Sequence, residues 1–257
     1  MQLLPERPGP ARRMNARSKL AVFLLALSCV PTLHAQNLTV HGRVEVTGET
    51  KSSDKKHIPV PSTVVWLTPA PGSEEKIDPP PPATWNPKLV QKNKDFQPHL
   101  LVVPAGSTVA FPNHDPFFHN VFSLFEGKRF DLGLYEAGTT RMVHFDRPGI
   151  SYIFCNIHSQ MSAVVITMGT PLYAVLESDG LVNIPNVPLG RYVLHVWSVG
   201  IGPEVEQPPT REVTIAENAT SLGVIHVPPA TAHIAHKNKY GREYDQPTPD
   251  SSIYTQP

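Results

Sequence analysis

The sequence predicts an all-β protein, and three observations lead to that class. Proline is abundant, with 29 residues, and helix interiors tolerate it poorly. After residue 35, no long run of Ala, Leu, Glu and Lys recurs at helical spacing. Instead, segments rich in Val, Ile, Phe and Thr alternate with turns that contain Pro and Gly, as in short strands of a sandwich. With 257 residues, 40% of them apolar, the chain can form one large or two small domains.

The first 35 residues are typical of a secretory signal. Basic side chains between Arg12 and Lys19 precede an apolar stretch from Leu20 to Val30, and Ala35 ends a small-residue cleavage site before Gln36. The apolar stretch has 11 residues, well short of the roughly 20 that a membrane-spanning helix needs, which favours cleavage over a membrane anchor. We therefore expect a periplasmic protein, cleaved near Ala35, with no stable membrane insertion afterwards.

Two details of this segment stay open. Met14 can serve as the start, which gives a signal of more usual length, and Cys29 can end a lipoprotein signal, although Ala26 stands where a Leu is usual. Export would remove five basic side chains and one acidic side chain, leaving 17 basic and 21 acidic side chains with a net charge of −4. No basic patch indicates nucleic-acid binding, and the charge balance is too mild to name a partner.

Short strand-like segments follow the signal in close succession, separated by turns that contain Pro and Gly. They lie at 38–46, 60–68, 89–91, 100–103, 107–111, 119–125, 139–145, 150–155, 163–168, 182–184, 192–199 and 212–215. A Pro-rich connector at 69–88 should be extended and exposed. We divide the chain into N-terminal strands with this connector, a central unit, a second β unit and a polar tail expected to be disordered. Their ranges are 36–95, 96–168, 171–227 and 229–257.

Cysteine use gives the first specific clue to function. Of the two cysteines, Cys29 leaves with the signal, so Cys155 is the one remaining thiol in a protein expected in an oxidising compartment. A lone thiol there is a liability unless it is buried or employed. An inert core cysteine is the bland alternative, but the neighbours of Cys155 favour a metal ligand.

The segment that begins at Cys155 carries metal-ligating side chains at short spacing. Cys155, His158 and Met161 follow a C-x2-H-x2-M pattern in a loop between two apolar strands, and His119 lies 36 residues earlier at the start of another strand. A thiolate, two imidazoles and a thioether form a soft ligand set that suits a copper electron-transfer site with a weak axial Met. Zinc is the competing metal, although it prefers sets without a thioether. Met161 is also a candidate for plain core packing.

The residues around this pattern resemble those of the cupredoxins. The resemblance rests on three stretches in order: Val103-Pro104-x-Gly106-x-x-Val109-x-Phe111-x-Asn113, His119-Asn120-Val121, and Phe145-x-x-Pro148-Gly149-x-x-Tyr152-x-x-Cys155. The short ligand loop is similar to that of amicyanin, and Phe-Asp-Leu-Gly at 130–133 is similar to methylamine-utilization-type cupredoxins. Over roughly residues 96–168, the resemblance implies a Greek-key β-sandwich of the amicyanin and plastocyanin kind.

The resemblance also implies a role for each residue of the pattern. His119 and His158 would bind one mononuclear type 1 copper ion through ring nitrogens, Cys155 through its thiolate, and Met161 as the axial sulfur. Asn120 would brace the ligand loop by hydrogen bonds without touching the metal. The loop departs from the amicyanin pattern because it contains no proline, which leaves the axial distance undecided.

Other histidines and several phenylalanines are weaker candidates. Three histidines near strand ends or in loops are most simply surface residues: His99, His114 and His144. Two in the tail have copper scavenging as their functional alternative: His233 and His236. Three aromatic residues near the first imidazole belong either to the core or to an apolar rim where a redox partner docks: Phe117, Phe118 and Phe122.

The second β unit resembles the carboxypeptidase-regulatory-like module, a small Ig-like β-sandwich with no chemistry of its own. The resemblance rests on the stretches 173–180 and 184–194. In that module the opening strands carry Gly-x-Val followed by Val-Val-x-Leu, and residues 42–44 and 64–67 match those patterns. Segment 38–68 therefore either packs with 171–227, with the central unit inserted between them, or supplies the first strands of the central unit.

Three functions follow from these observations. The first is a periplasmic one-electron carrier that is not an enzyme and meets a transient redox partner, such as a dehydrogenase or a cytochrome, with no nucleic-acid partner. The second is a copper carrier or store, which would use the same ligands but exchange the metal. The third is a metal-free β-sandwich that binds sugars or mediates adhesion, in which the four ligand residues would be incidental.

Overall fold

Strands make up all the regular structure in the described part of the chain. The computed structural model describes residues 37–47, 60–124, 127–176, 179–201, 209–230, 234 and 236–244. Within these ranges it contains sixteen strands and no helix, which confirms the predicted all-β class. The same residues accordingly include no helix with the length and apolarity to cross a membrane. The predicted signal at 1–35 lies outside the described residues.

Strands from both ends of the described chain form one β-sandwich, which we call the flanking sandwich. Its two sheets have the strand orders β13-β1-β16 and β12-β2-β14-β15. The first sheet contains β1 (Asn37–Val46), β13 (Leu181–Pro188) and β16 (Ser221–Val227). The second contains β2 (Thr63–Pro69), β12 (Tyr173–Leu176), β14 (Gly190–Ser198) and β15 (Thr210–Ile215). One apolar cluster, which includes Val40, Leu67 and Ile184, joins the inner faces of both sheets.

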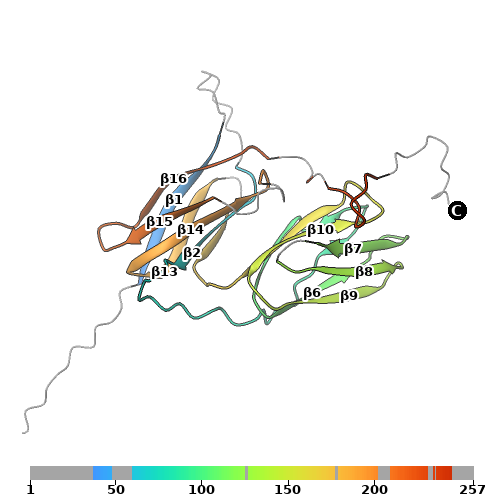
Figure 1. Ribbon diagram of the computed structural model, residues 1–257, viewed down its shortest axis with the longest axis horizontal. Helices are drawn as coiled ribbons and strands as arrows, with labels where there is room; N and C mark the ends of the chain where they lie inside the picture. Colours follow the sequence, from blue (N-terminus) through green and yellow to red (C-terminus); the bar gives the residue numbers. More distant parts are fainter. Residues whose placement is uncertain are drawn as a thin grey trace, which may run out of the picture. The chain divides into compact units, whose positions relative to one another are not determined.

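β1 shows how the sequence builds this sandwich. Its apolar residues Val40, Val44 and Val46 are buried, whereas the residues between them are mainly polar and exposed, as expected for a strand with one face on a core. β1 pairs antiparallel with β13 and parallel with β16, where Val44 lies opposite Ile225. In Figure 1 the blue β1 accordingly runs among the orange and brown strands of the C-terminal half. The strand pairing thus follows the first of the two arrangements considered for segment 38–68.

The residues between β2 and β12 form a second body, the central sandwich. Its larger sheet has the order β5-β11-β10-β7-β8, and its other strands pair as β6-β9 and β3-β4. The larger sheet contains β5 (Leu100–Pro104), β7 (His119–Ser123), β8 (Phe130–Tyr135), β10 (Gly149–Cys155) and β11 (Ser162–Met168). The other strands are β3 (Val90–Gln91), β4 (Phe96–Gln97), β6 (Ser107–Pro112) and β9 (Thr140–Phe145). An apolar cluster that includes Val109, Val121 and Ile153 packs the β6-β9 pair against the larger sheet.

Most of the strand-like segments in the sequence coincide with these strands, but β4, β8, β12 and β16 were not predicted. In each of these strands at most half of the residues are buried, so the sequence gives only a weak sign of a face packed on a core. In β8, Leu134 is 61% exposed, and in β16 four of the seven residues face solvent. Apolar alternation identifies a strand only where one face meets a core, so edge strands of this kind are hard to recognise.

A third apolar cluster contains residues of both sandwiches. Val64 and Trp197 belong to strands of the flanking sandwich, and Phe154 belongs to β10 of the central sandwich. Within this cluster the Tyr152 hydroxyl donates a hydrogen bond to the carbonyl of Ile201 at 3.2 Å and accepts one from Nε1 of Trp197 at 3.2 Å. The polar ends of two buried aromatic side chains are therefore satisfied inside an apolar cluster.

Part of the tail that was expected to be disordered is described, and it contacts the central sandwich. Ile234 is buried, and the ring of His236 stacks on that of Phe154 with a centroid distance of 4.0 Å. The Tyr244 hydroxyl donates to the carbonyl of Cys155 at 2.6 Å. The structure differs from the prediction here because an aliphatic side chain, an imidazole and a phenol pack on β10 despite the polar composition around them. We call residues 236–244 the C-terminal strap.

Candidate metal centre

The hairpin of β10 and β11 positions two of the predicted ligands. The strands are antiparallel, with Phe154 opposite Ser162, and nearly all of their residues are buried. Across the loop, the N–H of Cys155 donates to the carbonyl of Met161 at 3.3 Å, and the N–H of Met161 donates to that of His158 at 3.1 Å. Loop 156–161 therefore curls back on itself and holds His158 near the end of β10.

The third predicted ligand lies on the neighbouring strand. β7 pairs antiparallel with β10, with Val121 opposite Cys155. His119 lies two residues before Val121, so its side chain is on the same face of the sheet. The N–H of Asn156 donates to the carbonyl of Asn120 at 3.2 Å, which ties the ligand loop to β7.

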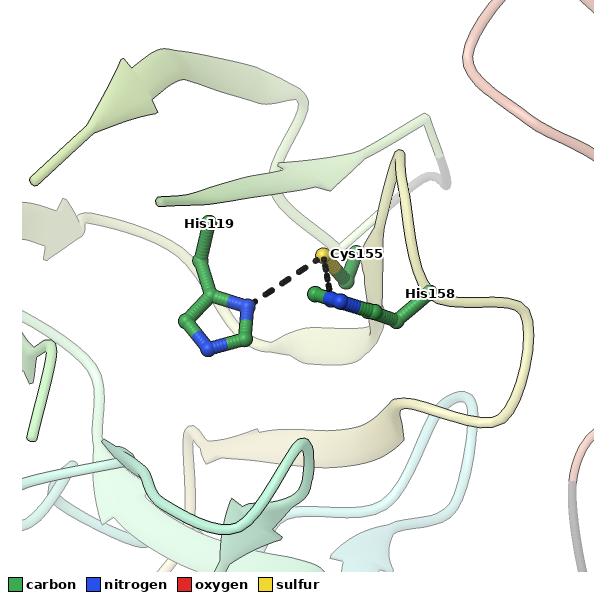
Figure 2. Close-up of side chains that lie close together, drawn as sticks. All are labelled: His119, Cys155 and His158. Atoms are coloured by element: carbon green, nitrogen blue, oxygen red, sulfur yellow. Dashed lines mark hydrogen bonds between the residues drawn. The ribbon is translucent and has the colours of Figure 1, made fainter. Parts of the chain in front are cut away.

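Together these elements bring His119, Cys155 and His158 to one point, with both imidazoles turned toward the sulfur (Figure 2). Sγ of Cys155 lies 3.7 Å from Nδ1 of His119 and 3.5 Å from Nδ1 of His158. One ligand atom from each of the three side chains lies within 4.8 Å of the others, a convergence that no other His, Cys, Asp and Glu in the described ranges show. An ion bound at about 2.0–2.3 Å by nitrogen and sulfur holds those atoms about 3.6 Å apart at near-tetrahedral angles. The donor set and its spacing therefore fit one metal ion.

Cys155 is fully buried, and its surroundings favour a neutral thiol until a metal binds. Burial raises the pKa of the Cys155 thiol, and this effect outweighs the N–H groups of Ile157, Asn120 and His158 that point at the sulfur. Because the thiolate is the form that binds metal, loading must release a proton from Cys155.

Both imidazoles are neutral at pH 7, which is the state that binds a metal. Burial lowers the pKa of His158 to about 4, and the nearby His119 adds to this effect. Burial also lowers the pKa of His119, although the carboxylate of Asp115 opposes it. For Asp115, burial alone would raise the pKa, but hydrogen bonds from the Lys94 amide, the His119 ring and the Asn93 amide hold it below its usual value. Asp115 is therefore an ionised acceptor beside a neutral imidazole.

Asp115 is the residue of the candidate site that the sequence pattern did not single out. Its buried carboxylate accepts a hydrogen bond from Nε2 of His119 at 2.8 Å and from the N–H groups of Asn93 and Lys94 at 2.6 and 2.9 Å. With the proton on Nε2, the lone pair of Nδ1 faces the Cys155 sulfur, as metal binding requires. The one signal in the sequence is an Asp four residues before a ligand, which many solvated loops share.

Asn120 contacts the ligand loop through its backbone and not through its side chain. Its carbonyl accepts from Asn156 and its N–H points at the sulfur of Cys155, whereas its side-chain Nδ2 donates to Asp131 on β8 at 2.7 Å. Met161, the fourth predicted ligand, is fully buried in the apolar cluster that contains Cys155.

Of the aromatic residues near the site, Phe117 contacts the ligands directly. Its ring lies 5.3 Å from that of His119 and 5.7 Å from that of His158, centroid to centroid. Phe118 is 55% exposed, and Phe122 is buried beside Phe154. The three candidates thus divide into a residue of the site, a surface residue and a core residue.

The other candidate histidines within the described residues are not part of the metal-binding group. The three surface candidates are indeed exposed: His99, His114 and His144. His236 packs on Phe154 and lies outside the metal-binding group. His233 lies outside the described residues.

Comparison with known proteins finds similarity only among solved structures. No protein-family model and no curated protein sequence matches the chain. A Cu-containing nitrite reductase from Thermus scotoductus SA-01 matches 33% of this chain with 22% identity and a TM-score of 0.31. A purple cupredoxin from Nitrosopumilus maritimus matches 32% with 21% identity and a TM-score of 0.30, and a variant of amicyanin in the Cu(I) form matches 32% with 16% identity and a TM-score of 0.31.

The matched segment spans 22% of the nitrite reductase chain, 100% of the purple cupredoxin and 82% of the amicyanin variant. Similarity at these identities and scores carries no information about activity. The assignment of the site therefore depends on the positions of His119, Cys155 and His158.

Proposed function

We propose that the protein binds one copper ion through His119, Cys155 and His158, with Met161 as axial ligand, and carries single electrons. The observation that supports this most directly is the convergence of the Cys155 sulfur and two imidazole nitrogens within 4.8 Å. Two imidazoles, a thiolate and a weak thioether are the ligands of a mononuclear type 1 copper site. When bound, copper supplies the one-electron redox chemistry.

The surrounding residues support this function because they fix the ligands in place. Backbone N–H groups from β7 and from the loop point at the Cys155 sulfur, and the Asp115 carboxylate orients His119. Ligands held in this way rearrange little when the charge of a bound ion changes, which keeps the barrier to electron transfer low. A neutral His158 needs no deprotonation before it binds.

The proposal includes a location and a partner. The signal-like segment at 1–35 favours export to the periplasm. The exposed ring of Phe118, next in sequence to the first ligand, is suited to brief docking of a redox protein, because such encounters bury small surfaces. On this view the protein is an electron carrier that catalyses no reaction of its own.

The experiment that tests the proposal is a visible spectrum of the purified protein after addition of Cu(II). We expect an intense charge-transfer band from thiolate to copper, its complete loss in Cys155→Ala, and its retention in His144→Ala, which changes an exposed histidine outside the site. Repeated reduction and reoxidation should leave the copper bound. A colourless protein with one tightly bound zinc would refute copper binding, and release of copper upon reduction would indicate a copper carrier instead.

A further inference from the structure

The C-terminal strap, residues 236–244, is hydrogen-bonded to the beginning of the ligand loop. The Tyr244 hydroxyl donates to the main-chain carbonyl of Cys155 at 2.6 Å. The main-chain N–H of Lys239 donates to the side-chain Oδ1 of Asn156 at 2.9 Å. The strap therefore contacts a ligand and the residue that follows it, although more than 80 residues separate the partners in sequence.

A second set of contacts joins the strap to β8 and through it to β7. Nζ of Lys239 lies 2.7 Å from Oδ2 of Asp131, and Oδ1 of Asp131 accepts from Nδ2 of Asn120 at 2.7 Å. Asn120 in turn directs its N–H at the Cys155 sulfur and accepts from the N–H of Asn156. The strap thus reaches the ligand loop by a direct and an indirect route.

Ring contacts hold the strap in this position. The His236 ring stacks on Phe154 with an interplanar angle of 13°, and Tyr244 meets His236 edge to face at 5.3 Å. Because Phe154 immediately precedes Cys155 on β10, these rings seat the strap on the strand that carries the thiol.

Hydrogen bonds and packing, and not a stiff backbone, hold the ligand loop. Residues 156–161 include no proline, whose fixed φ would limit the backbone. Connections without such restraints open easily unless packing or hydrogen bonds from elsewhere hold them. The contacts of Tyr244 and Lys239 provide hydrogen bonds of that kind.

We propose that the C-terminal strap is a positioning element for the metal-ligand loop, with Tyr244 as its principal positioning residue and Lys239 as a second. The strap limits opening of the loop at Cys155 and Asn156, and so restricts access of reagents to the thiol and release of a bound ion. Its effect on copper rests on the proposed function, whereas its effect on the loop exists without any metal.

The substitution Tyr244→Phe tests this role because it removes the hydroxyl and keeps the ring. The matched control is Tyr240→Phe, which removes a hydroxyl from a tyrosine of the same strap that is 71% exposed. In the metal-free full chain, we expect Tyr244→Phe to accelerate amide hydrogen exchange at residues 155–158 and alkylation of Cys155 by a maleimide, both measured peptide by peptide. In the copper-loaded protein it should accelerate copper loss to a chelator. The loss of one buried hydrogen bond corresponds to about a twofold to tenfold change.

A thermal unfolding transition will show whether Tyr244→Phe folds. If that variant does not fold, Lys239→Met provides an independent test. Its effect should have the same direction but be smaller, because a partly exposed ion pair contributes little. Exchange and alkylation rates equal to those of Tyr240→Phe would overturn the proposed positioning role. If Tyr244→Phe accelerates hydrogen exchange but leaves the rate of copper loss unchanged, the strap does not restrict release of the metal. A wild-type chain that binds no copper would instead refute the proposed function, and hydrogen exchange would still decide the role of the strap.

Discussion

Replacement of Asp115 by Asn examines the contact that orients the first imidazole. The carboxylate accepts three hydrogen bonds, from Nε2 of His119 at 2.8 Å and from the amides of Asn93 and Lys94 at 2.6 and 2.9 Å. An asparagine of the same shape keeps one acceptor oxygen and turns an NH2 group toward a donor. At least one of the three donors must therefore lose its partner, and the negative charge beside His119 disappears.

The size of the effect can be estimated from that contact. A hydrogen bond to a charged group contributes about 1.5–3 kcal/mol, and loss of an outer partner of a metal-bound histidine typically costs about 10–100-fold in metal affinity. We expect a decrease in copper affinity within that range. Because a carboxylate beside the ligand would stabilise Cu(II) more than Cu(I), a tenfold loss confined to Cu(II) would raise the reduction potential by about 59 mV.

The assay is competition with a chelator in each oxidation state, together with voltammetry. Asp146→Asn is the control, since Asp146 is a carboxylate on the surface of the same sandwich that pairs with Lys128. Copper affinity and potential indistinguishable between Asp115→Asn and the wild-type chain would refute the idea that Asp115 acts through His119. Equal changes in the Asp146 variant would show that general charge, and not orientation, is responsible.

Three further predictions concern the axial ligand, pH and the contact between the two sandwiches. Met161→Gln should keep copper bound and shift the reduction potential measured by voltammetry, because Gln can replace Met as a weak axial ligand; an unchanged potential would show that Met161 is not axial. The metal-free protein should lose stability as the pH falls from about 6.5 toward 4, because His158, with a folded pKa of about 4, takes up its proton in the unfolded state first. Urea unfolding at pH 7 and pH 5 measures this, and a difference that stays the same size in His158→Gln would assign it to other groups. Tyr152→Phe should lower the free energy of unfolding by about 1–3 kcal/mol, since the buried Trp197 N–H and Ile201 carbonyl both lose a partner; an unchanged urea midpoint would mean that water replaces the hydroxyl.

The candidate ligands stand out in the sequence because their side chains are chemically distinctive. A lone thiol, an imidazole three residues later and an apolar hairpin around them suit few structures, and the geometry brings Cys155 and His158 together with His119. Asp115 offered no such signal, since an aspartate in a loop usually faces water. Its role depends on the turn at Asn93 and Lys94, which supplies the two amides that allow a carboxylate to be buried.

The fold, too, could be predicted from the sequence only in part. The alternation in β1 identifies a strand with one buried face, but its parallel partner β16 is more than 170 residues away, and nothing local to either strand indicates the pairing. The order of the C-terminal strap could not be predicted for the same reason, because its partners are distant in the sequence. His236 and Tyr244 lie among polar residues, and only the apolar surface of β10 makes their order favourable.

The insertion of the central sandwich affects both the proteolysis of the protein and the order in which its strands are synthesised. A protease that cuts once in the exposed connector between β2 and β3 severs the polypeptide without freeing either body, since β1 and β2 stay paired with strands from the other fragment. Because the central sandwich is inserted between β2 and β12, synthesis from the N-terminus also sets the order in which the two sandwiches are completed. All strands of the central sandwich exist once residue 168 has been synthesised. The flanking sandwich begins with β1 but is completed last, because it needs β16.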